Sequence, residues 1–119
     1  MLVFSRSAGQ SVVIGGGIDV KILTVDGIGR VVRFEFTVPQ GIEIERSDGI
    51  HLKGKTENGL TKMVSYAQTD QTFNIGSDIK ILIGKFEISR SVMVGFEAPR
   101  SIQILRGELV ERPGQLERL

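Results

Sequence analysis

The sequence of 119 residues contains no cysteine and a single histidine, His51. Disulfide frameworks and thiolate metal sites are therefore excluded, and one imidazole cannot build a histidine cluster around a metal ion. No apolar run approaches the roughly 20 residues that a membrane-spanning helix needs. The N-terminus also lacks the layout of a signal peptide. We therefore expect a soluble, cytoplasmic protein with no metal or other cofactor.

A strong excess of charge is lacking as well, because 15 lysines and arginines face 14 aspartates and glutamates, for a net charge of +1. Bulk charge therefore gives no indication of a nucleic-acid partner, and any anionic partner would have to be held by a local basic cluster. Candidate catalytic groups are scarce. Glu43 and Glu45 are expected on a solvent-facing side of their strand, where no pattern of residues indicates a pocket. Ser5 has only His51 as a potential general base for nucleophilic catalysis. The sequence thus indicates no enzyme.

Helical periodicity is almost absent, and apolar and polar residues alternate with a period of two instead. The alternating runs are "LVFSR" (2–6), "IDVKI" (18–22), "VRFEFTV" (32–38) and "IEIER" (42–46). Turn-forming segments lie between the runs, namely "GGG" (15–17), "DGIG" (26–29) and "PQG" (39–41). This pattern predicts an all-β protein made of five short strands per unit, with little helix.

The second half of the sequence repeats the first. Residues 73–84, "FNIGSDIKILIG", match residues 12–23, "VVIGGGIDVKIL", with an offset of 61. Residues 92–99, "VMVGFEAP", match residues 32–39, "VRFEFTVP", with an offset of 60. Such a period indicates a duplicated unit. Because a unit of about 60 residues is marginally stable alone, we expect the two copies to pack as one body.

The matches also suggest where the copies begin and end. We place the first repeat at residues 1–50, a polar linker at 51–61, the second repeat at 62–110 and a C-terminal tail at 111–119. Within the linker region a frayed helical turn is expected near residues 50–52.

Three strands end in the same pattern of apolar, any, apolar, any, arginine, which aligns Arg6, Arg46 and Arg106 with apolar stripes. We expect these arginines at the rim of a sheet beside exposed aliphatic side chains. The ring of an unstacked base can pack on these aliphatic side chains, while the guanidinium binds a phosphate or a base edge. The alternative is a solvated arginine that only discourages pairing at the sheet edge.

These residues resemble the carbon storage regulator (CsrA/RsmA) family of bacterial RNA-binding translational regulators. The resemblance rests on the opening "MLVFSRSAGQSVVIG" and on "VRFEFTVP", "IEIER", "VGFEAP" and "IQILR", and it covers nearly the whole chain as two copies. Family members are homodimers of intertwined five-stranded subunits, with RNA sites where the first strand of one subunit lies beside the last strand of the other. The resemblance implies that this chain fuses such a dimer into one monomeric pseudo-dimer that binds GGA-containing RNA.

The same resemblance implies one intact RNA site and one damaged site. The intact site would join the first strand of copy one to the end of copy two, through Leu2, Phe4, Ser5, Arg6, Pro99, Arg100, Ile104, Leu105 and Arg106. A weaker second site would retain Arg46 and Ile44. There, however, Ser65 and Ala67 stand at the positions that Phe4 and Arg6 hold in the first copy. We therefore expect one working site per chain, with mRNA leaders or small regulatory RNAs as partners.

A second interpretation is a protein-interaction module that has lost strong RNA binding. The near-neutral charge and the loss of arginine at Ala67 favour it. Such a module would modulate an ordinary member of the family, or bind another protein partner such as an antagonist.

Overall fold

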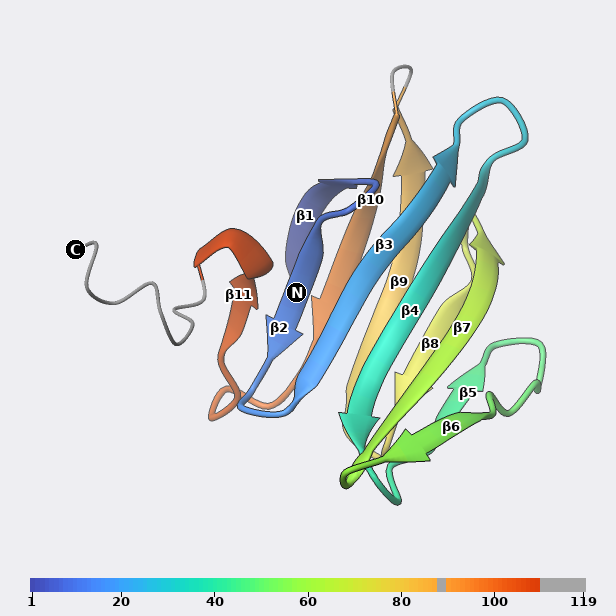
Figure 1. Cartoon of the computed structure of the whole chain (residues 1–119). Helices are drawn as coiled ribbons and strands as arrows, with labels where there is room; N and C mark the ends of the chain where they lie inside the picture. The colour runs from blue at the N-terminus through green and yellow to red at the C-terminus, as the bar shows by residue number, and fades with distance from the viewer. Residues whose placement is uncertain (88–89, 110–119) are drawn as a thin grey trace.

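The computed structural model describes residues 1–87 and 90–109, and these form eleven strands and one short 3-10 helix (Figure 1). In chain order they are β1 (Leu2–Ser7), β2 (Ser11–Ile14), β3 (Ile18–Asp26), β4 (Val31–Pro39), β5 (Ile44–Arg46), β6 (Gly54–Glu57), β7 (Leu60–Gln68), β8 (Thr72–Ile75), β9 (Ile79–Phe86), β10 (Ser91–Glu97), β11 (Ile104–Arg106) and η1 (Gly107–Leu109). The predicted all-β fold with little helix is confirmed.

The strands form two antiparallel sheets. One sheet has the order β1-β10-β9-β8-β5, and the other has the order β11-β2-β3-β4-β7-β6. No helix in the described part of the chain is long and apolar enough to cross a membrane.

The two copies exchange their end strands, so both sheets contain strands from both copies. From the first copy, β1 pairs with β10 and β5 pairs with β8. From the second copy, β7 pairs with β4 and β11 pairs with β2. The repeat offset makes β1 and β7 counterparts, and likewise β5 and β11, so the two exchanges are equivalent. This is the intertwined arrangement that the resemblance to the family implies, and neither copy completes a sheet by itself.

Apolar side chains from both copies form a single core. Strand β4 shows the alternation clearly, because its inward side chains are fully buried while the residues between them are half-buried. Phe73 of β8 packs edge-on against Phe34 and Phe36 of β4, with ring centroids 5.6 and 4.9 Å apart. Aromatic contacts of this kind add to the free energy of apolar burial. The cluster therefore links the second copy to the first.

The segment between the copies contains a strand that the sequence analysis did not expect. Strand β6 pairs with β7, and the two strands are joined by Asn58 and Gly59, whose φ angles are 54° and 78°. Two positive φ angles at Asn-Gly are typical of a type I′ hairpin turn. The polar composition of residues 51–61 concealed this signal. The helical turn expected near residues 50–52 is wrong, since His51 forms an isolated β-bridge there instead.

Candidate nucleic-acid interface

The strands predicted to form the intact site lie at corresponding edges of the two sheets. Strand β1 ends one sheet and β11 ends the other, on the same side of the molecule (Figure 1). Arg6, near the end of β1, connects the two edges. Its guanidinium donates two hydrogen bonds, of 2.8 and 3.1 Å, to the carboxylate of Glu108 in η1. The two end strands of the chain, far apart in sequence, therefore meet in the fold.

Arg6 lies inside this junction, with only 5% of its side chain exposed. Its Nε donates to the carbonyl oxygen of Ser5 at 2.9 Å, and Nη1 also donates to that of Ser11 at 3.3 Å. The expectation that Arg6 stands at an exposed rim is wrong. The reason is that the chain folds back after β1 and brings the carbonyl of Ser11 to the guanidinium, while η1 supplies the carboxylate of Glu108.

Arg106, by contrast, is exposed at the end of β11. No hydrogen bond or ion pair with another described residue engages its guanidinium. The other predicted site residues vary in exposure: Leu2, Ser5 and Arg100 are exposed, whereas Phe4, Pro99, Ile104 and Leu105 are half-buried. The arrangement offers a free guanidinium beside partly exposed apolar side chains.

The backbone of β1 adds a second recognition element. This strand has a neighbour, β10, on one side only, so the N–H and C=O groups of its other side have no strand partner among the described residues. Unpaired edge groups can accept a further strand or hydrogen-bond to the edges of unstacked bases. The first strand can therefore offer both side chains and backbone to a ligand.

The corresponding site at the other side of the molecule is built differently. Arg46 donates to the carboxylate of Asp48 over 2.9 and 2.7 Å, and its Nη1 also donates to Ser65 Oγ at 3.2 Å and to the carbonyl oxygen of Tyr66 at 3.0 Å. The side-chain hydrogen bond between the pair is the main reason why the pKa of Arg46 is raised and the pKa of Asp48 is lowered. This guanidinium is therefore already occupied.

The loss of one arginine explains the difference. Each copy places an acidic residue two positions after its last-strand arginine, Asp48 after Arg46 and Glu108 after Arg106. In the first site the acid pairs with Arg6 of the other copy, which leaves Arg106 unpaired. The second copy has alanine at the position of Arg6, so Asp48 pairs with Arg46 instead.

The strand edge is closed at the second site as well. Strand β7 is the counterpart of β1, but β6 pairs along the edge that β1 leaves open. The close approach requires glycine at Gly54, because a Cβ there would collide with the carbonyl oxygen of Lys62. The predicted contact residue Ile44 is also buried, at 1% exposure. Neither a free arginine nor a free edge remains.

The Arg6–Glu108 pair predicts a loss of stability in acid. The hydrogen bonds from Arg6 are the main cause that lowers the pKa of Glu108 from 4.5 to about 2. Because the folded pKa lies below the unfolded one, the contribution of this carboxylate is fully present above pH 4.5 and is lost as the pH falls towards 2. We expect the urea midpoint to fall over this window, and to fall less steeply in Glu108→Gln. Equal slopes in the two proteins would contradict the role of this pair.

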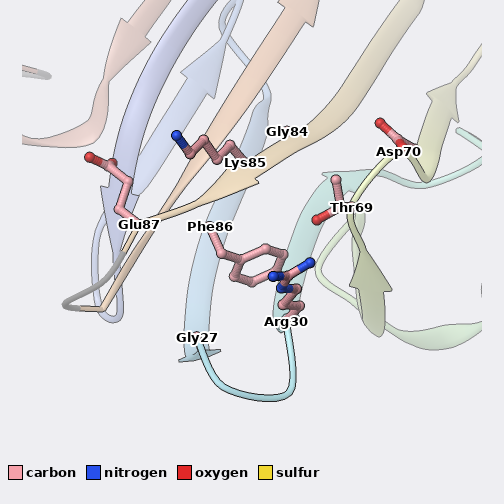
Figure 2. A pocket seen from close by; sticks show the side chains of 8 residues that line it. All are labelled: Gly27, Arg30, Thr69, Asp70, Gly84, Lys85, Phe86 and Glu87. Carbon is pink, nitrogen blue, oxygen red and sulfur yellow. The ribbon is translucent and has the colours of Figure 1, made fainter.

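A separate cavity of about 560 Å³ lies between the β3–β4 turn and the end of β9 (Figure 2). Its charged lining residues are Arg30, Lys85, Asp70 and Glu87. Glu87 accepts a hydrogen bond from Ser5 Oγ at 2.5 Å, which is the main reason why its pKa is lowered. Two basic and two acidic side chains give the cavity no net charge, so it does not indicate a ligand of either sign.

Comparison with protein-family models matches residues 1–50 and 67–114 to CsrA, described as the global regulator protein family. The two segments together cover most of the chain, and they support the tandem organisation inferred from the repeats. The second match begins at residue 67, so it leaves out most of the degenerate strand β7. Searches of curated proteins and of solved structures gave no match. The family match confirms the resemblance noted from the motifs.

Proposed function

This chain belongs to the CsrA family of global regulators, and from that premise we propose that it binds GGA-containing RNA through one composite site per chain. Members of the family are RNA-binding post-transcriptional regulators and not enzymes. The proposed target is a GGA motif in a single strand or loop, in an mRNA leader or a small regulatory RNA. Binding would act on translation in the cytoplasm, by occlusion or by a change in RNA structure.

The observation that carries the proposal is the asymmetry between the two arginines. Arg106 is exposed and unpaired among the described residues, and it lies on the side of the molecule where β1 has an open edge. Arg46 is held by Asp48, and the edge of β7 is covered by β6. One site therefore retains a cation and backbone groups for an anionic, unstacked ligand, and the other retains neither.

Recognition at the proposed site divides between three kinds of group. The open backbone edge of β1 hydrogen-bonds to base edges, and Arg106 and Arg100 contact phosphates or bases. Leu2, Phe4, Ile104 and Leu105, with Pro99, supply apolar surface beside them. Arg6 and Ser5 act less directly: Arg6 holds η1 against β1, and Ser5 is held by Glu87.

We propose that the chain works as a monomer. The two copies complete each other's sheets, so a second chain is not needed to fill an edge that an ordinary family subunit would leave to its partner. The short strand β6 also covers the edge at which β7 would otherwise be open.

Titration with a short GGA hairpin tests the proposal. Saturation is expected at one RNA per chain, measured with protein and RNA well above the dissociation constant, for example by calorimetry or native mass spectrometry. The affinity should fall steeply with salt, because phosphate contacts release counterions. The same hairpin with its GGA changed to CCU is the control and should bind much more weakly. Saturation at two hairpins per chain would contradict the single-site proposal.

The alternative function is a protein-interaction module, and the closed second site together with the net charge of +1 favours it. In that case the chain would bind an ordinary family member or another protein and would not bind the GGA hairpin even at low salt. Co-purification with a family member, combined with absence of RNA binding, would support this alternative over the proposed function.

A further inference from the structure

Three lysines, Lys53, Lys55 and Lys62, gather at the outer face of the β6–β7 hairpin. The register places Lys55 directly opposite Lys62, and Lys53 precedes β6 on the same side of the hairpin. Like charges directly opposite one another in an antiparallel pair are destabilising. No ion pair to a described residue relieves these lysines. A ligand with negative charge would relieve them.

The lysines border a groove of about 620 Å³. Leu60 and Val64 lie along β7 in this groove and are 44% and 43% exposed. Glu57 is the acidic residue of its lining. The groove thus combines a basic rim with an accessible apolar floor.

One step further along the same face of β7 is an exposed aromatic ring. Tyr66 is 57% exposed, and the guanidinium of Arg33, its register partner on β4, lies 5.8 Å from the ring centroid. The Nε atom of Arg33 is buried without a hydrogen-bond partner. In the first copy the position of Tyr66 is held by Ser5. The strand that lost the family's arginine therefore carries an exposed ring at a position where its counterpart β1 has a serine.

We propose that this outer face, formed by Tyr66, Val64, Leu60 and the three lysines, binds single-stranded RNA that flanks the recognised motif. Aromatic rings stack on unpaired bases of any sequence, and lysines along the same groove contact the phosphates. An acidic peptide would also suit the lysines, but the Tyr66–Arg33 platform favours a base. The inference rests on the proposed function, because the GGA motif bound at the first site would hold the adjoining single-stranded RNA close to this surface.

The fold allows one RNA to reach both places. Strands β11 and β6 are the two edges of the same sheet, separated by five strand spacings. At about 4.8 Å per spacing this amounts to roughly 24 Å, within the longest dimension of the molecule, 41 Å. A single-stranded flank of sufficient length that leaves the first site can therefore span the distance to the hairpin. The second half of the pseudo-dimer would thus extend the footprint on one RNA and would not bind a second motif.

The test compares a GGA hairpin with the same hairpin carrying a single-stranded uridine tail of about 12 nucleotides, a length within the range of single-strand binding sites. With the wild-type protein the tail is expected to raise the affinity about tenfold or more. The gain should be lost in Lys55→Gln/Lys62→Gln and in Tyr66→Ser, while the affinity for the untailed hairpin stays unchanged. Loss of two phosphate contacts should also reduce the salt slope for the tailed RNA by about 1.4.

The matched control is Lys80→Gln/Lys85→Gln, which removes the same charge from exposed positions of β9 and should keep the tail effect. A wild-type protein that binds both RNAs equally, or a tail effect that survives both test variants, would overturn the proposal. The same holds if the control variant loses the effect to the same extent.

The experiment also separates this proposal from the one it rests on. If neither hairpin binds, the proposed function fails, and the uridine tail alone is then titrated at low salt. Weak binding that disappears in Lys55→Gln/Lys62→Gln and in Tyr66→Ser would support the surface by itself, and absence of such binding would overturn it. A polyglutamate peptide that competes for the groove when the tail does not bind would assign the surface to a protein partner and overturn the RNA proposal.

Discussion

Replacing Arg106 by alanine is expected to weaken binding of a GGA hairpin about 5- to 150-fold, whereas Arg46→Ala leaves the affinity unchanged. The factor corresponds to about 1–3 kcal/mol for the loss of a charged hydrogen-bonding partner. Arg106 is exposed and unpaired among the described residues, so its guanidinium is available to the RNA. Arg46 already donates to Asp48, Ser65 and Tyr66. Fluorescence anisotropy with a labelled hairpin measures both variants under the same salt conditions.

The order of the two variants should reverse when the free energy of unfolding is measured, with Arg46→Ala now showing the larger effect. Arg106→Ala removes a solvated side chain and is expected to leave the urea midpoint within error of wild type. Arg46→Ala removes hydrogen bonds to Ser65 and Tyr66 and is expected to lower the free energy of unfolding by about 1 kcal/mol. If both variants weakened RNA binding equally, the asymmetric interface would be wrong.

The second large effect is expected at Arg6, on stability. Arg6→Ala should lower the free energy of unfolding by about 2–3 kcal/mol, because it removes hydrogen bonds of a buried charged donor and leaves the carbonyls of Ser5 and Ser11 without them. It also releases Glu108 and with it the contact between β1 and η1. Urea denaturation followed by circular dichroism measures the loss.

Arg106→Ala serves as the control for this experiment, since it removes the same type of side chain from the same interface without removing a described hydrogen bond. If Arg6 acted only by touching RNA, Arg6→Ala would be as stable as wild type and would lose only RNA affinity. That outcome would contradict the structural role assigned to the buried arginine.

Much of the fold could be predicted from the sequence because its signals are local or repetitive. The alternation in "VRFEFTV" corresponds to the buried and half-buried pattern of β4, since side chains along a strand point to opposite faces in turn. The offset of about 60 residues predicted two copies, and the exchange of end strands followed from the resemblance to a dimeric family. The alternation and the duplication can be seen in the spacing along the chain, whereas the strand exchange was implied by the resemblance alone.

Strand β6 was missed although its signal was present. Asn58-Gly59 is a strong indicator of a two-residue hairpin, but the flanking residues "GKTE" and "LTKM" do not form an apolar strand pattern on both sides. All four residues of β6 are exposed, so burial gives the strand no sequence signature. Its pairing with β7 determines the closed edge at the second site.

The sequence by itself determined the duplication, the strands of the two repeats and the loss of one arginine, at Ala67. It could not decide which arginine remains free, because Arg6, Arg46 and Arg106 end strands with the same pattern. That was decided by the partner each one meets in the folded chain. Arg6 meets a carboxylate 102 residues away, whereas Asp48, lacking such a partner, pairs with Arg46 two residues before it. The strength of an ion pair depends on the distance and burial of its charges, and only the tertiary structure sets these.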